Sequence, residues 1–311
     1  MTRHNDNHTE EGPLTALASR PPETAAPTRG AWHVAAPFFI AVLAAAAVAA
    51  IYLVFVRTSI GQVIDTMAMR GADVNHPKIV EVLDRVLNGT TLVSLVLVCV
   101  AAAAIGVLRQ RVDLAVGAAV MVVAANGSAQ LLKDRLGRPN LDNFPAPNSF
   151  PSGHTAAAAS VAFALILVLP YAVRGLVALI GAGYVAIIAV ATVWAEWHRL
   201  SDTVAGLLMV LAWGALITGV LRARRYRIPG VLARVNRVAK VPLLIVVAVF
   251  GLAGTLGLGA VVISHRVTAD FVSGRFVFAA GSACVIAAVA GIFLIWLRCA
   301  AGDQPAGEPS S

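Results

Sequence analysis

Eight apolar runs dominate this chain, and each is close to the length that a helix needs to cross a bilayer. They lie at residues 35–56, 91–108, 114–132, 155–173, 175–195, 202–221, 241–263 and 277–297. A helix spans a hydrocarbon core of roughly 30 Å in about 20 residues. Only 13% of the residues are charged, against about 25% in soluble domains. The sequence therefore excludes a water-soluble globule and predicts an all-α, polytopic transmembrane helix bundle.

The spacing of the runs divides the chain into five parts. Residues 1–31 are polar and rich in Pro and Thr, a composition that predicts a disordered cytoplasmic tail. Six helices follow in 32–221, then a basic cytoplasmic loop at 222–240, two additional transmembrane helices at 241–297 and a cytoplasmic tail at 298–311. Because the last two helices carry almost no polar residues, we expect them to be an appendage to a six-helix core.

Basic residues in the short loops predict the orientation in the membrane. The connection at 222–240 carries seven Lys and Arg residues and no acid, so we expect it on the cytoplasmic side, with both termini. The outer side then includes residues 57–90, which we predict to be a loop with one short amphipathic helix near 78–87. The net charge of +8 is explained by insertion and contact with anionic lipids, and nucleic-acid binding is not implied.

Three polar clusters lie at the mouths of spans, where polar groups are candidates for a functional site. The first runs from Asn126 through Gln130 and Lys133 to Arg138, the second is Pro151-Ser152-Gly153-His154, and the third runs from His198 to Asp202. All three fall on the outer side in this topology. Their convergence on one face predicts a single site there.

The second cluster has the chemistry of an anion seat. Ser152 is a good N-cap, and Gly153 lets a backbone approach a ligand, so the following helix offers N–H groups to an anion. Lys133 and Arg138 add positive charge, and the guanidinium can bind a phosphate through two hydrogen bonds. These residues predict a site of phosphate size.

The histidines supply reactive groups. Asp202 follows His198 by four residues, close enough to orient its imidazole, and a histidine oriented by an acid is a base or a nucleophile. Two histidines that face one phosphate can take different roles: one attacks phosphorus, and the other protonates the departing oxygen. The structural alternatives are a snorkelling Lys133, an interfacial His198 beside Trp197, and Asp202 as an ordinary helix-start acid.

At these residues the chain resembles the type 2 phosphatidic acid phosphatase (PAP2) superfamily. Membrane members of that family have six core helices and the motifs Lys-x6-Arg-Pro, Pro-Ser-Gly-His and Ser-Arg-x5-His-x3-Asp. The second motif is intact at 151–154, and the third keeps its latter half as His198-x3-Asp202. The order, the spacing and the helical context also match over roughly residues 90–221. The resemblance implies a six-helix PAP2-like core.

The resemblance also implies roles for individual residues. His198 would be the nucleophile that forms a phosphohistidine, with Asp202 raising its nucleophilicity, and His154 would be the general acid. Lys133, the Ser152 hydroxyl and the Gly153 amide would bind phosphate oxygens. Such sites use neither a metal nor a cofactor, and the chain has no convincing ligand cluster for a metal.

Two arginines of the family motifs are missing at their strict positions. Asn140 stands seven residues after Lys133, and the Ser-Arg pair of the third motif falls on Ala191 and Thr192. Each lost charge-assisted contact should cost about 1.5–3 kcal/mol. We therefore expect Arg138, through a shorter loop, and Arg199, beside the nucleophile, to act as substitutes.

The sequence thus predicts a membrane phosphatase that hydrolyses a lipid phosphate monoester or diphosphate at the extracytoplasmic face of the cell membrane. Prenyl diphosphate, phosphatidate and phosphatidylglycerol phosphate all fit. One alternative is a lipid phosphotransferase that uses the same site. Another is a non-catalytic relative that binds or moves lipid phosphates, which Asn140 and Thr192 favour. The oligomeric state is not predicted.

Overall fold

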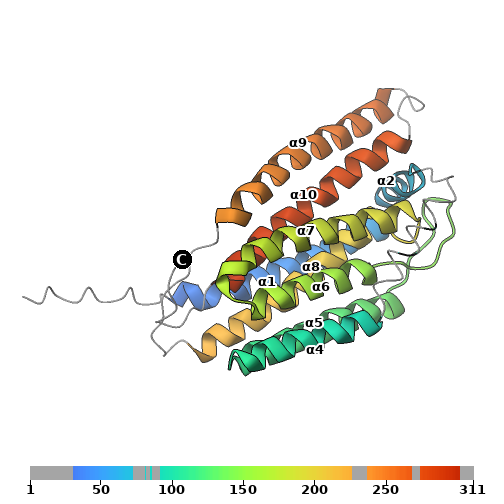
Figure 1. Ribbon diagram of the computed structural model, residues 1–311. Coiled ribbons are helices and arrows are strands. Elements are labelled where there is room, and N and C mark those ends of the chain that lie inside the picture. Colours follow the sequence, from blue (N-terminus) through green and yellow to red (C-terminus); the bar gives the residue numbers. More distant parts are fainter. Residues whose placement is uncertain are drawn as a thin grey trace, which may run out of the picture.

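The computed structural model describes residues 31–72, 81, 85, 92–225, 237–267 and 274–301. Several sequence-based expectations lie wholly or largely outside these residues: the tail at 1–31, the amphipathic helix near 78–87, most of the loop at 222–240 and the tail at 298–311. Every regular element in the described residues is a helix (Figure 1).

Eight long helices correspond in order to the eight apolar runs. They are α1 (Ala31–Ile51), which continues into the π-helical turn η2 (Tyr52–Val56), α4 (Leu92–Leu108), α5 (Val112–Arg135), α6 (Gly153–Val168), α7 (Tyr171–Trp194), α8 (Leu200–Arg224), α9 (Arg237–Val267) and α10 (Gly274–Ala300). Within the described residues, six helices are long and apolar enough to cross a membrane, and α4 and α6 contribute shorter apolar stretches. The prediction of an all-α, multi-pass membrane protein is confirmed.

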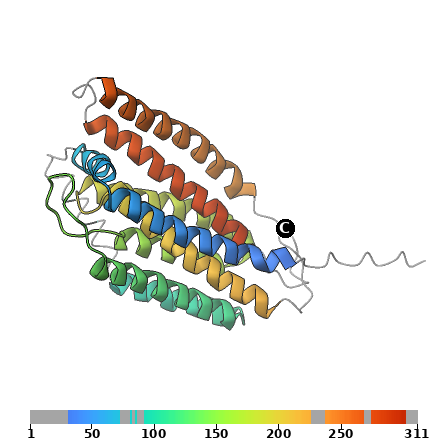
Figure 2. The same ribbon diagram turned by 180° about the vertical axis from the view of Figure 1, so that it is seen from behind.

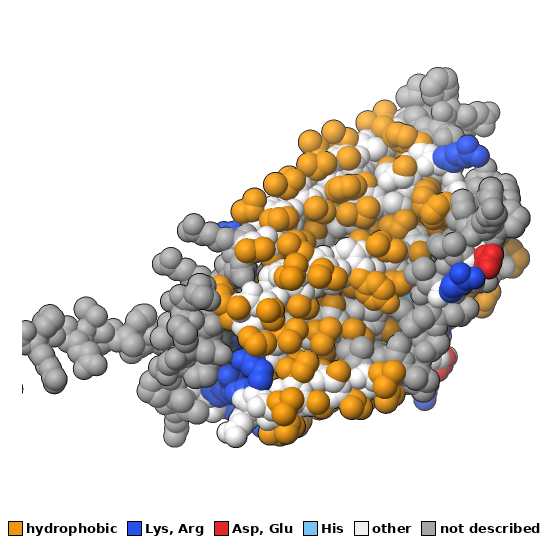
Figure 3. Space-filling model, viewed as in Figure 1, with side chains coloured by type: hydrophobic (Ala, Val, Ile, Leu, Met, Phe, Trp, Pro, Cys, Tyr) orange, Lys and Arg blue, Asp and Glu red, His pale blue; other side chains and the backbone are white. Residues whose placement is uncertain are grey.

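The long helices lie side by side along one direction, and a ninth, short helix α2 (Ser59–Arg70) lies at one end of the bundle (Figures 1 and 2). Apolar side chains cover the flank of the bundle, and the described charged side chains gather toward its two ends (Figure 3). Large apolar residues such as Leu97, Val123, Ile187 and Leu252 are more than 60% exposed. This is the surface that a bilayer solvates.

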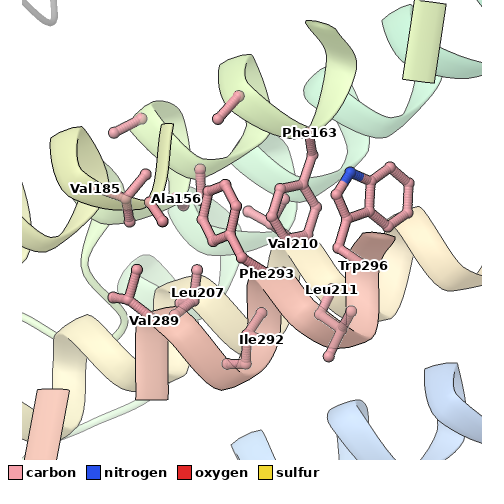
Figure 4. Close-up of a cluster of buried hydrophobic side chains, with 14 of the residues drawn as sticks. Ala156, Phe163, Val185, Leu207, Val210, Leu211, Val289, Ile292, Phe293 and Trp296 are labelled. Atoms are coloured by element: carbon pink, nitrogen blue, oxygen red, sulfur yellow. The ribbon is translucent and has the colours of Figure 1, made fainter. Parts of the chain in front are cut away.

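Three aromatic rings fill the middle of the bundle (Figure 4). Phe163 of α6 stacks on Trp296 of α10, with ring centroids 4.6 Å apart, and meets Phe293 edge-on at 5.1 Å. None of the three side chains is exposed. The reading of 241–297 as an appendage is therefore wrong for α10, which belongs to the packed core. It fits α9, which packs mainly on α10.

The helix ends opposite α2 are closed by arginines. Arg222 of α8 donates to the carbonyl oxygens of His33 and Cys299, at 3.0 and 2.5 Å. Arg174 donates to Ala300 at 2.8 Å, and Arg109 donates to Val168 at 2.6 Å. Basic side chains suit the carboxyl ends of helices, where carbonyl groups lack helical partners. The candidate site lies at the other end of the bundle.

Candidate active site

The amino-terminal turns of α6 and α8 pack directly on each other. Ser152 caps α6, with its Oγ accepting from the Thr155 backbone N–H at 3.3 Å, and its own N–H donates to the Asp202 carbonyl at 2.8 Å. A Cβ atom on Gly206 would overlap the Ser152 carbonyl oxygen. Only glycine at position 206 permits this approach, which joins the second and third polar clusters.

The two histidines of these clusters face each other. The His154 and His198 ring centroids are 5.8 Å apart with an interplanar angle of 64°, and His154 also lies 5.4 Å from the Trp197 ring. His198 is 4% exposed, and its backbone N–H donates to the Thr192 carbonyl at 3.1 Å. Thr192 thus shapes the turn before His198. The predicted convergence of two imidazoles is present.

Asp202 is a fully buried carboxylate with several neighbours. Its Oδ2 accepts from the Ser149 hydroxyl at 2.5 Å and from the Arg199 backbone N–H at 2.9 Å. The His198 Nδ1 lies 3.8 Å from the same oxygen. That separation exceeds a hydrogen bond, although catalytic hydrogen bonds are often long before substrate binds.

Arg138 brings an unused guanidinium to the site. Its side chain is 3% exposed, and its Nη2 lies 3.5 Å from the Asp202 Oδ1. None of its three guanidinium nitrogens has a hydrogen-bond partner among the described residues. Buried donors are nearly always satisfied, so their vacancy points to an anionic ligand. Asn140, at the strict motif position, is exposed.

The other predicted phosphate-binding side chains lie close by. The Lys133 Nζ would be 4.0 Å from a Cβ atom built on Gly153, which places the ammonium beside the start of α6. Arg199 is 2% exposed, and it donates from Nε to the Thr66 Oγ1 at 3.3 Å and from Nη1 to the Ser149 Oγ at 3.4 Å. All eight predicted site residues therefore lie at one end of the bundle.

The helix α2 was not predicted, since residues 57–77 were expected to form a loop. Thr58 caps α2 by accepting from the Gly61 N–H at 3.1 Å. Polar residues recur at positions 62, 65 and 66, on one helical face. This i, i+3, i+4 pattern behind a threonine cap was the signal that could have found it.

Asp65 is the acidic residue of α2, and it is buried. It accepts from the Ser201 backbone N–H at 3.1 Å and from the Ser201 hydroxyl. Burial, and after it the charge of Asp202, raise its pKa to about 7. A carboxyl that titrates near neutral pH beside a cluster of charged groups is typical of a functional site.

Among the described residues, no group of three or more His, Cys, Asp or Glu side chains is arranged to hold a metal ion. The polar groups gathered at this end are mostly hydrogen-bond donors and cations. Such a set suits an anion better than a cation.

Comparisons with known proteins found two matches. The model of the PAP2 superfamily matches residues 114–227, which run from α5 through α8. A similar solved structure is described as the "Crystal structure of the first transmembrane PAP2 type phosphatidylglycerolphosphate phosphatase from Bacillus subtilis". It is 18% identical, with a TM-score of 0.47, and the match covers 64% of this chain and 100% of that one. No curated protein matches the chain.

Proposed function

We propose that the chain is a membrane phosphatase acting on lipid phosphates, because the model of the PAP2 superfamily matches residues 114–227. One observation carries the proposal. The ring centroids of His154 and His198 lie 5.8 Å apart, and Asp202, which lies beside His198, also contacts Arg138, whose buried guanidinium lacks hydrogen-bond partners among the described residues. Paired imidazoles and vacant cationic donors are what transfer of a phosphoryl group needs.

In the first step, His198 attacks phosphorus. Its Nδ1 faces Asp202, so Nε2 is the nitrogen that forms the new N–P bond while the bond from phosphorus to the leaving oxygen breaks. Asp202 stabilises the positive charge that develops on the ring. His154 donates a proton to the leaving oxygen, so that a lipid alcohol departs, or a lipid phosphate if the substrate is a diphosphate.

In the second step, water replaces the lipid. His154 is now the base, and it takes a proton from the water molecule that attacks the phosphohistidine. The N–P bond breaks, inorganic phosphate is released and His198 regains its starting form. The same histidine serves as acid and then as base because the two half-reactions mirror each other.

Four kinds of donor hold the phosphoryl oxygens in this proposal. Lys133 and Arg138 supply positive charge, and the Gly153 amide lies at the amino end of α6. The Ser152 oxygen accepts two hydrogen bonds from Thr155, so the Ser152 hydroxyl hydrogen is available to donate to the phosphate. Arg199 completes the set. Charge-assisted hydrogen bonds of this type are about twice as strong as neutral ones.

A lipid substrate is supported by an apolar groove next to the site. The groove has a volume of about 660 Å³ and lies between α1, α5 and α8, from Tyr52, Leu136 and Phe150 down to Ala41 and Leu216. At 1.5 Å per helical residue, the stretch from Ala41 to Tyr52 measures roughly 16 Å. A bilayer lipid with its phosphate at Ser152 would lay an alkyl chain in this groove.

We assign the site to the extracytoplasmic face of the cell membrane. The arginines that close the opposite helix ends, such as Arg174 and Arg222, match the enrichment of basic residues on the cytoplasmic side. The lipid headgroup would then enter from the outer leaflet.

The proposal is tested by phosphate release from purified protein in detergent. Phosphatidate, prenyl diphosphate and phosphatidylglycerol phosphate are supplied in turn, with and without a chelator. His198→Ala and His154→Ala are compared with His265→Ala, which changes a histidine outside the three clusters. We expect release that withstands the chelator, survives in His265→Ala and is lost in the two site variants.

Other outcomes identify the alternatives. If phosphate appears only weakly but is transferred to an added lipid or sugar alcohol, the protein is a phosphotransferase. Binding of all three lipids without release would indicate a non-catalytic relative. Release that the chelator abolishes would contradict a metal-free mechanism.

A further inference from the structure

The helix α2 turns a polar face toward the protein at the site end of the bundle. Gln62, Asp65 and Thr66 are 1%, 1% and 8% exposed. Burying such groups is costly unless partners satisfy them, so their partners reveal what the helix does. Each of the three contacts a segment that carries a residue of the proposed site.

Gln62 binds the loop that carries Arg138. Its Nε2 donates to the Pro139 carbonyl at 2.7 Å and to the Val56 carbonyl at 2.7 Å, and its Oε1 accepts from the Leu141 N–H at 3.0 Å. The peptide groups directly after Arg138 are thereby tied to α2. This fixes the shortened loop through which Arg138 reaches Asp202.

Thr66 binds the second arginine. Its Oγ1 accepts from the Arg199 Nε at 3.3 Å and donates to the Asp142 Oδ2 at 2.6 Å. Because the Thr66 hydroxyl donates its hydrogen to Asp142, a lone pair of its oxygen is left to accept from the Arg199 guanidinium. Thr66 therefore sets the direction in which Arg199 points.

Asp65 binds the first turn of α8 through both Ser201 contacts. A carboxylate is favourable at the amino end of a helix, where N–H groups lack partners. Ser201 stands between Arg199 and Asp202, so this contact fixes the turn from which both side chains emerge.

We propose that Gln62, Asp65 and Thr66 are positioning residues that hold Arg138 and Arg199 in place for phosphate binding. The inference rests on the proposed function, in which these arginines replace the two motif arginines that this chain lacks at positions 140 and 192. None of the three α2 residues needs to touch the substrate. Their effect passes through the arginines.

Double-mutant cycles test this coupling. Thr66→Val removes the hydroxyl at nearly constant volume, Thr66→Ser keeps it, and each is combined with Arg199→Ala. Gln62→Leu is combined in the same way with Arg138→Ala. The dissociation constant of inorganic phosphate and the kcat and KM for a lipid phosphate are measured for every variant.

Loss of one hydrogen bond is expected to weaken phosphate binding and raise KM roughly 3- to 10-fold in Thr66→Val. Thr66→Ser should restore the wild-type values. In the Arg199→Ala background, Thr66→Val should have almost no further effect. Gln62→Leu should likewise have almost no effect once Arg138 is absent.

Met69→Ala is the matched control, because Met69 is a buried residue of α2 with no hydrogen bond to either arginine segment. It should lower thermal stability and combine additively with both arginine variants. Additive effects for Thr66→Val and Gln62→Leu as well would overturn the inference and leave the proposed function standing. Coupled effects on phosphate binding in a protein without turnover would overturn the function and support the inference.

Discussion

The guanidinium of Arg138 lies 3.5 Å from the carboxylate of Asp202, yet all three of its nitrogens lack a hydrogen-bond partner among the described residues. The ion pair with Asp202 stabilises the buried positive charge of Arg138. The N–H groups of its guanidinium remain able to donate hydrogen bonds to an anionic ligand. We therefore expect Arg138 to replace the motif arginine that is absent at position 140.

Arg138→Ala is expected to lower kcat/KM for a lipid phosphate by roughly 10- to 150-fold, which corresponds to about 1.5–3 kcal/mol for a charged hydrogen bond. Arg138→Lys should recover part of the loss, since an ammonium keeps the charge without two-point binding. The exposed Arg135 supplies the control, and Arg135→Ala should leave kcat/KM unchanged. Equal activity of the two alanine variants would exclude Arg138 from phosphate binding.

His154→Ala is expected to discriminate between leaving groups. An alkyl alcohol is a poor leaving group and needs the proton of a general acid, whereas p-nitrophenol leaves readily without one. The variant should lose roughly 10²- to 10⁴-fold in kcat on a lipid phosphate and much less on p-nitrophenyl phosphate. Steady-state measurement of kcat with both substrates tests this prediction. Equal losses of kcat on the two substrates would mean that His154 is not the general acid.

The apolar groove predicts selectivity for alkyl chains. Ala45 of α1 lines it, while the adjacent Ala46 does not. Ala45→Phe should raise KM for long-chain lipid phosphates and leave p-nitrophenyl phosphate turnover intact, and Ala46→Phe should change neither. A shift of both substrates in Ala45→Phe would show that the groove serves stability and not chain binding.

Asp65 predicts a pH-dependent stability. Its pKa rises from 3.8 in the unfolded chain to about 7 because of burial. Only the folded protein holds this proton at intermediate pH, so the contribution is full below pH 3.8 and is lost as the pH rises through about 7. The Tm difference between wild type and Asp65→Asn in detergent should therefore shrink from pH 5 to pH 8, and a constant difference would contradict the assignment.

Gly206→Ala is expected to lower both stability and activity, although Gly206 is not one of the proposed site residues. The added methyl group would overlap the Ser152 carbonyl oxygen and push α6 away from α8, so both Tm and kcat should fall. Gly127→Ala is the control in α5, where a Cβ atom meets open space, and it should raise stability by about 0.5–1 kcal/mol. Unchanged kcat in Gly206→Ala would separate this contact from catalysis.

The spans and the site were accessible from sequence for different reasons. Long apolar runs are almost sufficient to predict transmembrane helices, and Pro151-Ser152-Gly153-His154 predicted an anion site at the start of α6. The helix α2 was missed because the partners of its buried polar residues, Gln62, Asp65 and Thr66, are brought close only by the fold. The core position of α10 was equally hidden, since Trp296 and Phe293 look like lipid-facing residues until α6 is placed against them.

The contact between α2 and α10 predicts that the C-terminal helices contribute to activity. A Cβ atom on Gly71, at the end of α2, would overlap the backbone of Gly274, the first residue of α10. A chain that stopped at residue 240 would retain every proposed catalytic side chain but lose both the support behind α2 and the core rings of Phe293 and Trp296. Genetic trimming to a minimal six-helix enzyme should therefore yield a protein that still inserts into the membrane but turns over substrate poorly.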